Sequence, residues 1–328
     1  MNRFRFMSAG ALLCLGLTVL PSLSSAQAPA YPSKPLRLLV SNPPGGTVDT
    51  LARAVAEGLT QNLGQTVVVE NKPGVNGNIA ADLVAKAPAD GHTLLMTPPG
   101  PLTVNAVLYS TLPFDPDTAF APVSEVAIAP LVLVVPKALP VHDLKELLAY
   151  MKANPAKANF ASQGNASSGH LAMELLKSRT GLAAAHVPYK GSAPALNDLL
   201  GGNVSMMFDN VTSSLPQIRA GALRAIAVAE RTRLQVLPDV PTVEEQGVPG
   251  FELTPWFGIV TTGGTPAPVV EKLSRSVADV LNSPAVRKRF ESIGVELRPS
   301  SPSAFGTYIK AQSTELTRLV KASGAKAD

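Results

Sequence analysis

The chain has 328 residues, of which 45% are hydrophobic and 16% are charged, and its formal net charge is +4. This composition is typical of a globular protein with room for two domains, and it excludes a disordered chain. Arg3 and Arg5 supply two of the positive charges, and no basic run with interleaved aromatic residues follows them. We therefore expect no nucleic-acid partner.

The first 26 residues have the pattern of a secretory signal peptide. Arg3 and Arg5 precede an apolar run at residues 9–20, and small residues follow at 24–26. The run is too short to span a bilayer, and Cys14, the only cysteine, lies inside it. We expect this segment to be cleaved and the mature chain to be a periplasmic protein that folds without disulfides.

Short apolar runs then alternate with segments of helical periodicity. In the first segment of helical period, Leu51, Val55 and Leu59 lie on one face. We expect strands at residues 36–40, 66–70, 93–97, 123–135, 158–161, 185–189, 204–208, 223–229, 256–262 and 295–298. We expect helices at residues 47–63, 168–178, 193–200, 212–220, 267–281, 284–293 and 302–323.

This alternation predicts an α/β fold with mainly parallel sheets covered by helices. The long run at 123–135 and the returning run at 256–262 break the rhythm, as strands that cross between two domains would. We expect a discontinuous first domain, residues 27–128 plus 257–328, and an inserted second domain, residues 129–256. The two crossing strands would form a hinge, with a ligand cleft between the domains.

Ligands of open α/β sheets bind at the carboxyl ends of the strands. The segments that follow the predicted strands are rich in Gly, Ser, Thr and Asn, which expose backbone N–H groups and add hydroxyl and amide donors. These segments are residues 43–49, 71–79, 97–100, 162–168, 190–193 and 209–212. We expect the binding residues there.

The stretch "SNPPGGTVDT" at residues 41–50 joins a predicted strand to a predicted helix. Gly45 and Gly46 let a ligand approach the backbone closely, and Thr47 is a good N-cap. The exposed N–H groups of such a helix start favour a carboxylate or a phosphate. The stretch "SQGNASSGH" at residues 162–170 offers the same arrangement from the other domain, although either stretch alone is also compatible with a simple capped turn.

Enzyme motifs are missing from the sequence. The patterns G-x-G-x-x-G, G-x-x-x-x-G-K-[ST] and G-x-S-x-G do not occur, and the four histidines have no metal-ligand spacing. Asp49, Asp209 and His170 lie nearest the expected cleft and could form an acid/base site, but an acid near a helix start also simply complements the helix dipole. We expect no catalytic residue, no metal and no cofactor.

Several stretches, in order along the whole mature chain, resemble the extracytoplasmic solute receptors of tripartite tricarboxylate transporters, known as Bug receptors. They are "YPSKPLRLLV", "PPGG", "LGQTVVVENKPGVNGNIAAD", "DGHTLLM", "SQGNASSGHLAMELL", "HVPYKGSAPALNDLLGGNVSMMFDN", "LPDVPTVEEQG" and "WFGIVTTGGTPAPVVEKL". The resemblance implies a periplasmic-binding-protein type II-like fold that closes on a small carboxylate. It also implies transient contact with a membrane permease, and no catalysis.

In that family the ligand carboxylate is held largely by backbone amides and ordered water from both domains. Carried over, this points to Gly45, Gly46 and Thr47 on one side of the cleft, whereas "TPPG" at residues 97–100 departs from the loop often found there. The residues expected to bind the ligand are Pro44, Gly45, Gly46, Thr47, Asp49, Asn78, Thr97, Ser162, Asn165, Ser167, Ser168, His170 and Asp209.

We expect a monomer that captures a small organic acid for a tripartite tricarboxylate-type transporter. Two alternatives stay open on the sequence alone. One is a ligand-sensing receptor that signals to a membrane sensor, and the other is a secreted α/β enzyme that uses Asp49, Asp209 or His170.

Overall fold

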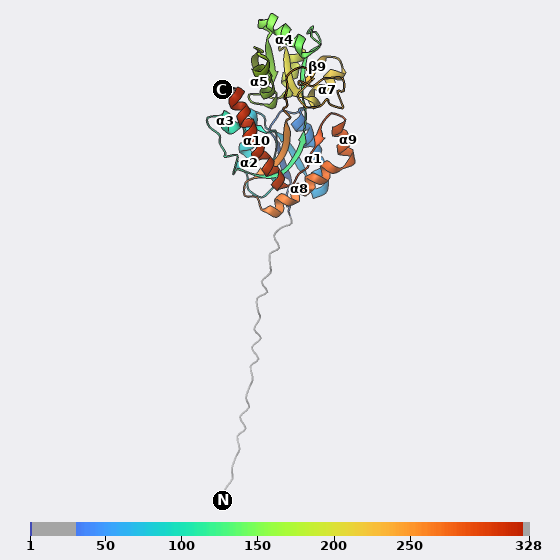
Figure 1. The fold of residues 1–328 in the computed structure, drawn as a ribbon. Coiled ribbons are helices and arrows are strands. Elements are labelled where there is room, and N and C mark those ends of the chain that lie inside the picture. The colour runs from blue at the N-terminus through green and yellow to red at the C-terminus, as the bar shows by residue number, and fades with distance from the viewer. Residues whose placement is uncertain (2–30, 324–328) are drawn as a thin grey trace. The chain divides into compact units, whose positions relative to one another are not determined.

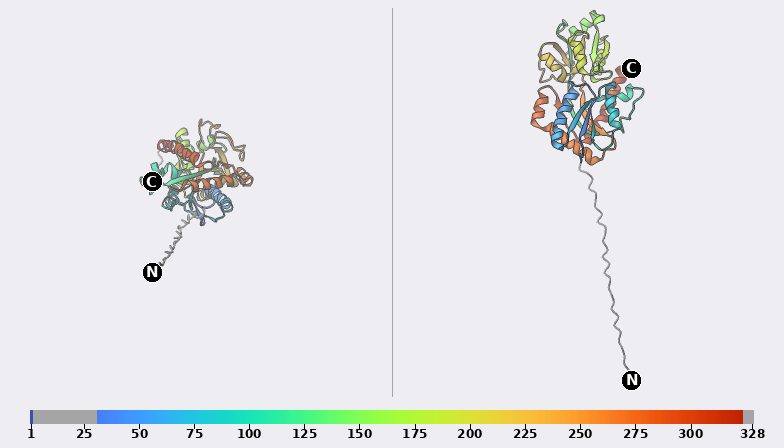
Figure 2. Two further views of the ribbon diagram at one scale, coloured as in Figure 1. Left: turned by 90° about the horizontal axis from the view of Figure 1, so that it is seen from below. Right: turned by 180° about the vertical axis from the view of Figure 1, so that it is seen from behind.

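Two β-sheets organise the chain in the computed structural model, which describes Met1 and residues 31–323. The predicted signal peptide, residues 1–26, lies outside the described residues except for Met1. We call each sheet with its covering helices a lobe. In Figure 1 the helices α1, α2, α8 and α9 surround the first sheet, and α4, α5 and α7 surround the second (Figure 1, Figure 2).

The first sheet has six strands in the order β11-β4-β10-β3-β1-β2. Its strands are β1 (Leu36–Val40), β2 (Val67–Asn71), β3 (Thr93–Thr97), β4 (Phe120–Ile128), β10 (Trp256–Thr262) and β11 (Glu296–Leu297). The second sheet has five strands in the order β7-β6-β8-β5-β9. Its strands are β5 (Leu131–Pro136), β6 (Asn159–Ser162), β7 (Ala185–Pro188), β8 (Met206–Asn210) and β9 (Leu223–Val228).

Both sheets are mixed, and the expectation of mainly parallel sheets is wrong. β1 is parallel to β2 and β3, and β6 is parallel to β7 and β8. The antiparallel pairs are β10 with β3 and β4, β11 with β4, and β5 with β8 and β9. Each of these pairs includes β4, β5 or β10, which adjoin the two connections between the sheets. The predicted α/β class itself is confirmed.

Ten α-helices cover the sheets in the described part of the chain. They are α1 (Thr47–Leu63), α2 (Asn78–Ala85), α3 (Asn105–Leu108), α4 (Leu144–Ala153), α5 (Ser168–Thr180), α6 (Ser192–Leu200), α7 (Val211–Arg219), α8 (Ala267–Asn282), α9 (Pro284–Glu291) and α10 (Pro302–Ser323). Short 3-10 turns occupy Val75–Gly77, Gly100–Leu102 and Pro155–Lys157.

The first helix shows how local sequence sets these elements. In α1, Leu51, Val55 and Leu59 are fully buried against the first sheet, as their four-residue spacing predicts. The helix ends at Gly64, which adopts the left-handed conformation (φ 68°) that glycine tolerates best. Because α1 follows β1 after a short turn, the start of the helix lies near the carboxyl end of that strand.

Two backbone segments connect the lobes. The apolar run at 123–135 is not one strand, because β4 ends at Ile128 and β5 begins at Leu131 in the other sheet. Ala129, between the two strands, donates its N–H to the carbonyl of Pro255 (3.1 Å), which lies on the returning segment just before β10. The predicted domain boundaries, residues 27–128 plus 257–328 and 129–256, stay a prediction.

Helix α10 is a third link between the lobes. Its first half packs on β4 of the first sheet, and its later part contacts α5 of the second lobe. Phe305 is accordingly buried in a hydrophobic cluster of the first lobe, and Val320 in the core of the second. No helix in the described residues is long and apolar enough to cross a membrane.

Candidate functional site

A cavity lies between the two lobes and is lined from both. About 60 Å³ of it is open to the centres of water-sized molecules, which is room for a few waters or a small solute. The first lobe contributes Asn42, Pro43, Gly46, Thr47, Val48, Asn76, Pro98, Pro99, Gly100 and Val104. Phe257 of β10 also comes from the first lobe. The second lobe and the linking segments contribute Gln163, Ala166, Ser167, Ser168, Leu171, Gly191, Ser192, Ala193, Asn210, Pro255 and Leu316.

Four α-helices begin at this cavity. The N-cap residues of α1, α5, α6 and α7 are Gly46, Ser167, Gly191 and Asn210, and all four line it. The first N–H groups of a helix have no partner within the helix, and the helix dipole places partial positive charge there. The wall therefore has the chemistry of an anion site without containing a cation.

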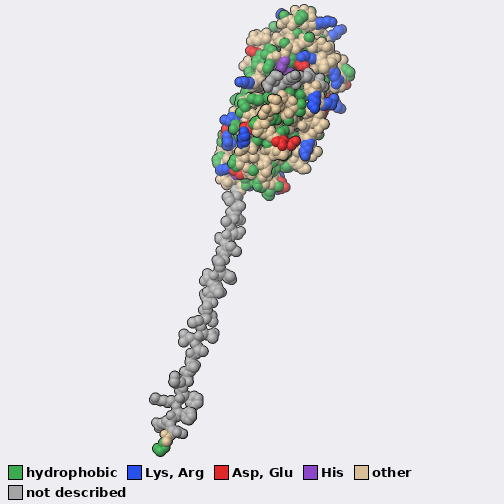
Figure 3. All heavy atoms as spheres, turned by 90° about the vertical axis from the view of Figure 1, so that its left-hand side faces the viewer, with side chains coloured by type: hydrophobic (Ala, Val, Ile, Leu, Met, Phe, Trp, Pro, Cys, Tyr) green, Lys and Arg blue, Asp and Glu red, His purple; other side chains and the backbone are tan. Residues whose placement is uncertain are grey.

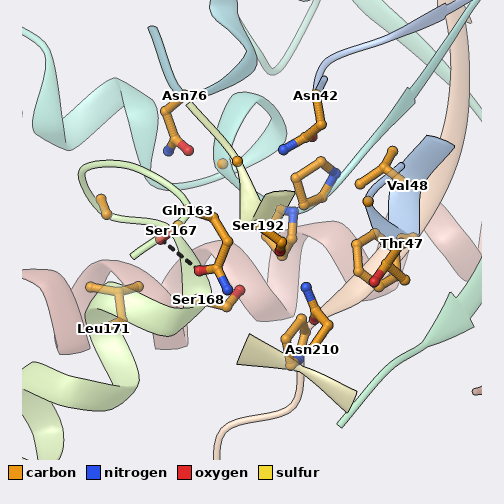
Figure 4. Close-up of a pocket in the computed structure, with 18 of the residues that line it drawn as sticks. Asn42, Thr47, Val48, Asn76, Gln163, Ser167, Ser168, Leu171, Ser192 and Asn210 are labelled. Carbon is orange, nitrogen blue, oxygen red and sulfur yellow. Dashed lines mark hydrogen bonds between the residues drawn. The ribbon is translucent and has the colours of Figure 1, made fainter. Parts of the chain in front are cut away.

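The four helix starts differ in how they are capped. At α5, the Ser167 hydroxyl oxygen accepts from the N–H of His170 (3.4 Å) and the hydroxyl donates to Gln163 Oε1 (3.2 Å; Figure 4). No side chain caps α1, α6 or α7. A ligand in the cavity would thus find no side-chain cap at the starts of α1, α6 and α7 and an internally capped start at α5. At α7 the first N–H, that of Val211, already donates to the carbonyl of Pro130 (2.8 Å), so the donors left there are those of the following residues.

The lining carries no charge. None of the lining residues, all of which belong to the described part of the chain, is Asp, Glu, Lys, Arg or His. On the molecular face seen in Figure 3, Lys and Arg side chains are scattered rather than gathered in one patch. The cavity would hold an anion through neutral donors and helix dipoles rather than through an ion pair.

Asp209 holds the second-lobe wall together from behind. It is fully buried and accepts from Ser192 Oγ (2.6 Å), Ser214 Oγ (2.7 Å) and Gln163 Nε2 (2.9 Å). Burial raises the pKa of Asp209, and the hydrogen bonds from Ser192, Ser214 and Gln163 oppose that rise. Because these donors belong to α6, α7 and the loop before α5, one carboxyl group sets the relative positions of three elements at the cavity.

Asp49 has a similar structural role in the first lobe. It lies in the first turn of α1, is buried, and accepts from the N–H of Gly45 (3.0 Å), from Arg53 and from Asn71 Nδ2 (2.9 Å). Burial alone would raise the pKa of Asp49, but the hydrogen bonds from Arg53, Gly45 and Asn71 outweigh it and lower the pKa. These bonds fix the turn that leads into α1.

Two stacked histidines support the loop before α5. The ring centroids of His170 and His186 lie 3.8 Å apart. His170 Nδ1 accepts a hydrogen bond from the N–H of Ala166 (2.8 Å). A hydrogen bond of 2.6 Å joins His186 Nε2 to Ser162 Oγ. Burial first, and the neighbouring His170 second, lower the pKa of His186 to about 3. His170 and Ser162 are buried and do not line the cavity.

The structure brings some of the residues expected from the sequence to the cavity and not others. Gly46, Thr47, Ser167 and Ser168 line it. Asn165 lines a neighbouring hollow that shares Asn42, Asn76, Pro98 and Gln163 with the cavity. The remaining expected residues line neither space; they are Pro44, Gly45, Asp49, Asn78, Thr97, Ser162, His170 and Asp209.

Sequence reasoning did not single out several wall residues. Gln163, Ser192, Asn210 and Asn76 all lie in the segments that follow strands, so the position in the sheet was the available indication. Leu316, in the last helix, carries no such indication.

The chain has two α/β lobes and, between them, a cavity that is lined by helix starts and neutral hydrogen-bond donors. This arrangement defines the class of two-lobed solute-binding proteins. The family model "Tripartite tricarboxylate transporter family receptor" matches residues 51–325, and the chain belongs to that family. The predicted family is thus confirmed. Because this is a family of transporter receptors, the chain is a solute-binding protein and not an enzyme.

Solved structures agree with this assignment. The periplasmic binding protein BugD is 36% identical, with a TM-score of 0.86 over 90% of this chain and 99% of that one. A protein of R. palustris solved with adipate is 38% identical, with a TM-score of 0.87 over 90% and 99% of the two chains. MatC from Rhodopseudomonas palustris with bound malate is 32% identical, with a TM-score of 0.84 over 88% and 100%.

Proposed function

We propose that this receptor binds a small carboxylate in the cavity between its lobes and passes it to a tripartite tricarboxylate-type permease. One observation carries the proposal: α1, α6 and α7 begin at the cavity without a side-chain cap. Their N–H groups would donate to the carboxylate directly or through water, and water-mediated contacts are nearly as favourable as direct ones. The adipate and malate seen with the two relatives support an organic acid as the ligand.

The lobes would close over the acid and exclude water from it. Gly46 and Thr47 would supply donors from the first lobe, and Ser192 and Asn210 from the second. Closure strengthens these contacts because neutral hydrogen bonds gain in a medium of low dielectric constant. The periplasm would be reached through the signal peptide at residues 1–26, and the receptor would act as a monomer that contacts the permease only transiently.

Native mass spectrometry of protein purified from the periplasm tests the proposal. We expect a co-purified small acid, and an N-terminus near Gln27 or Pro29. Titration calorimetry should show that the acid binds to protein from which the co-purified ligand has been removed. Small-angle scattering should show that the protein is more compact with the acid bound than without it. Turnover of the acid, or the absence of binding by any small carboxylate, would contradict the proposal.

A further inference from the structure

One end of the cavity is apolar and is built from three separate parts of the chain. Val104 lies just before α3, Leu171 lies in the first turns of α5, and Leu316 lies on α10. Val104 and Leu171 belong to one buried hydrophobic cluster, and Leu316 packs against it. In Figure 4 Leu171 lies on the opposite side of the cavity from Thr47 and Val48, with Gln163 and Ser192 between them.

The polar groups at this end are committed to partners within the protein. Gln163 Oε1 accepts from Ser167, and Gln163 Nε2 donates to Asp209 Oδ1 (2.9 Å) and to the carbonyl of Phe208 (3.1 Å). Ser167 also caps α5. Beside Leu171, the Ser168 hydroxyl remains as a side-chain donor, and the Asn76 amide, on the same side of the cavity in Figure 4, donates to Asn105 Oδ1 (2.8 Å). Both groups are neutral.

We propose that the solute is a small monocarboxylate whose remaining surface is apolar, and that Leu316 is the residue that selects against a second charge. This inference rests on the proposed function. The single carboxylate lies at the uncapped starts of α1, α6 and α7, and the hydrocarbon part contacts Leu171 and Leu316.

The preference follows from solvation. A second carboxylate at the apolar end would lose its hydration and meet no cation and few donors, and an ion buried without partners is strongly disfavoured. A methylene or methyl group placed there gains by leaving water. The cavity thus accepts a ligand that is charged at one end only.

Titration calorimetry with acids matched in carbon number tests the inference. Butanoate should bind at least about tenfold more tightly than succinate, and hexanoate more tightly than adipate, because only the diacids bury a second charge. Affinity should rise about threefold to fourfold with each added methylene until the chain reaches the apolar wall. Diacids that bind as tightly as their matched monoacids would overturn the inference and leave the proposed function standing. If no acid of either series binds, the proposed function itself fails.

Leu316→Lys tests the role of that residue. The new ammonium group should lower the monoacid-to-diacid affinity ratio at least about tenfold, since it pairs with the second carboxylate. Thr314→Lys is the matched control, because Thr314 is exposed on the same helix and does not line the cavity; its ratio should equal that of the wild type.

A smaller side chain provides an independent test if the lysine variant folds poorly. Leu316→Ala should lengthen the apolar end, so that octanoate gains affinity relative to butanoate. An unchanged chain-length preference in Leu316→Ala, or an unchanged ratio in a folded Leu316→Lys, would show that Leu316 does not set specificity.

Discussion

The hydroxyl oxygens of Thr47 and Ser213 lie 3.4 Å apart, and they belong to opposite lobes. Thr47 is the first residue of α1, and Ser213 lies in the first turn of α7. Two helix starts that line the cavity are therefore within hydrogen-bonding distance of each other across it. The described arrangement is a closed one, and changes at this contact should act on closure.

Gly191 is the first place to test closure. It has φ +125°, and a Cβ atom there would lie 2.8 Å from Pro43 Cδ in the other lobe. Gly191→Ala should keep the lobes apart and weaken ligand binding by more than about tenfold, or 1.4 kcal/mol. Calorimetry would give the affinity, and small-angle scattering should show that the ligand no longer makes the protein compact.

Gly202→Ala is the control for backbone strain. Gly202 also has a positive φ (+74°), but a Cβ atom there would meet nothing within 4 Å. Both alanine variants carry backbone strain of about 1–3 kcal/mol. Gly191, with φ 125° and ψ 177°, lies in a region that is essentially restricted to glycine. Equal losses of affinity in the two variants would mean that strain, and not the contact with Pro43, explains the effect.

Gly46 tests the helix start of α1. Its φ of −85° suits any residue, and the nearest atom to an added Cβ is the carbonyl oxygen of Pro43 at 4.0 Å. Gly46→Val should therefore fold, with a stability loss below about 1 kcal/mol, and its side chain should occupy space beside the ligand and abolish binding. Gly46→Ala should give an intermediate affinity. A valine variant that melts and binds like the wild type would place the ligand elsewhere.

Asp209 should be needed for both stability and binding. Asp209→Asn offers one acceptor oxygen where three side chains donate, so we expect a loss of about 1–3 kcal/mol in the free energy of unfolding. Binding should weaken too, because Ser192 and Gln163 lose the partner that positions them. Ser214→Ala removes one of the same donors without touching the cavity wall, and should cost stability more than affinity. Chemical denaturation and calorimetry on both variants would separate the effects.

Stability should depend on pH through two carboxyl groups near Arg298, the buried Glu125 and the partly buried Glu230. Burial is the main cause that raises the pKa of Glu125 and that of Glu230 from 4.5 to about 7. The folded protein then keeps protons that the unfolded chain releases, so the contribution of these two groups to the free energy of unfolding should be largest below pH 4.5 and should fall as the pH rises through about 7. Glu125→Gln should flatten this fall in thermal melts, and Glu315→Gln, at an exposed position, should not.

Trp256 should report ligand binding by its fluorescence. It is the only tryptophan of the chain and is fully buried in β10, where its ring packs edge-on against Phe305 and Tyr308 of α10. Phe257, the next residue, lines the cavity. Ligand should change the emission with the same midpoint as in calorimetry, and constant emission at saturation would show that β10 and α10 do not respond to the ligand.

Much of the fold could be predicted where periodicity and termination signals agree. The predicted bounds of β1, α1, β3 and α10 equal those observed. The four-residue α3 is too short for a periodic pattern, and α2 and α4 were not predicted either. The division of residues 123–135 was missed because two buried strands of different sheets look like one mainly apolar run, in which Pro130 lies between them.

The site could be predicted in part, because only wall residues that directly follow a strand in the sequence could be recognised there. The starts of α1 and α5 follow strands directly, so Gly46 and Ser167 were accessible to sequence reasoning. Asp209 and its donors Gln163 and Ser214 come from different segments, and only the fold shows that the donors satisfy the acid. Leu316 resembles any apolar residue on a helix, and nothing local relates it to a cavity.

The uncharged lining determines which protonation state of an acid the receptor binds. No side chain on the described cavity wall can gain or lose a proton, so the acid itself is the one group there that titrates. Its anion meets partial positive charge at the helix starts, whereas the neutral acid does not. A neutral organic acid diffuses through lipid unaided, while its anion is held back by the cost of losing its hydration. On the proposed function, the receptor takes up the anion, the form that depends on a transporter to enter the cell.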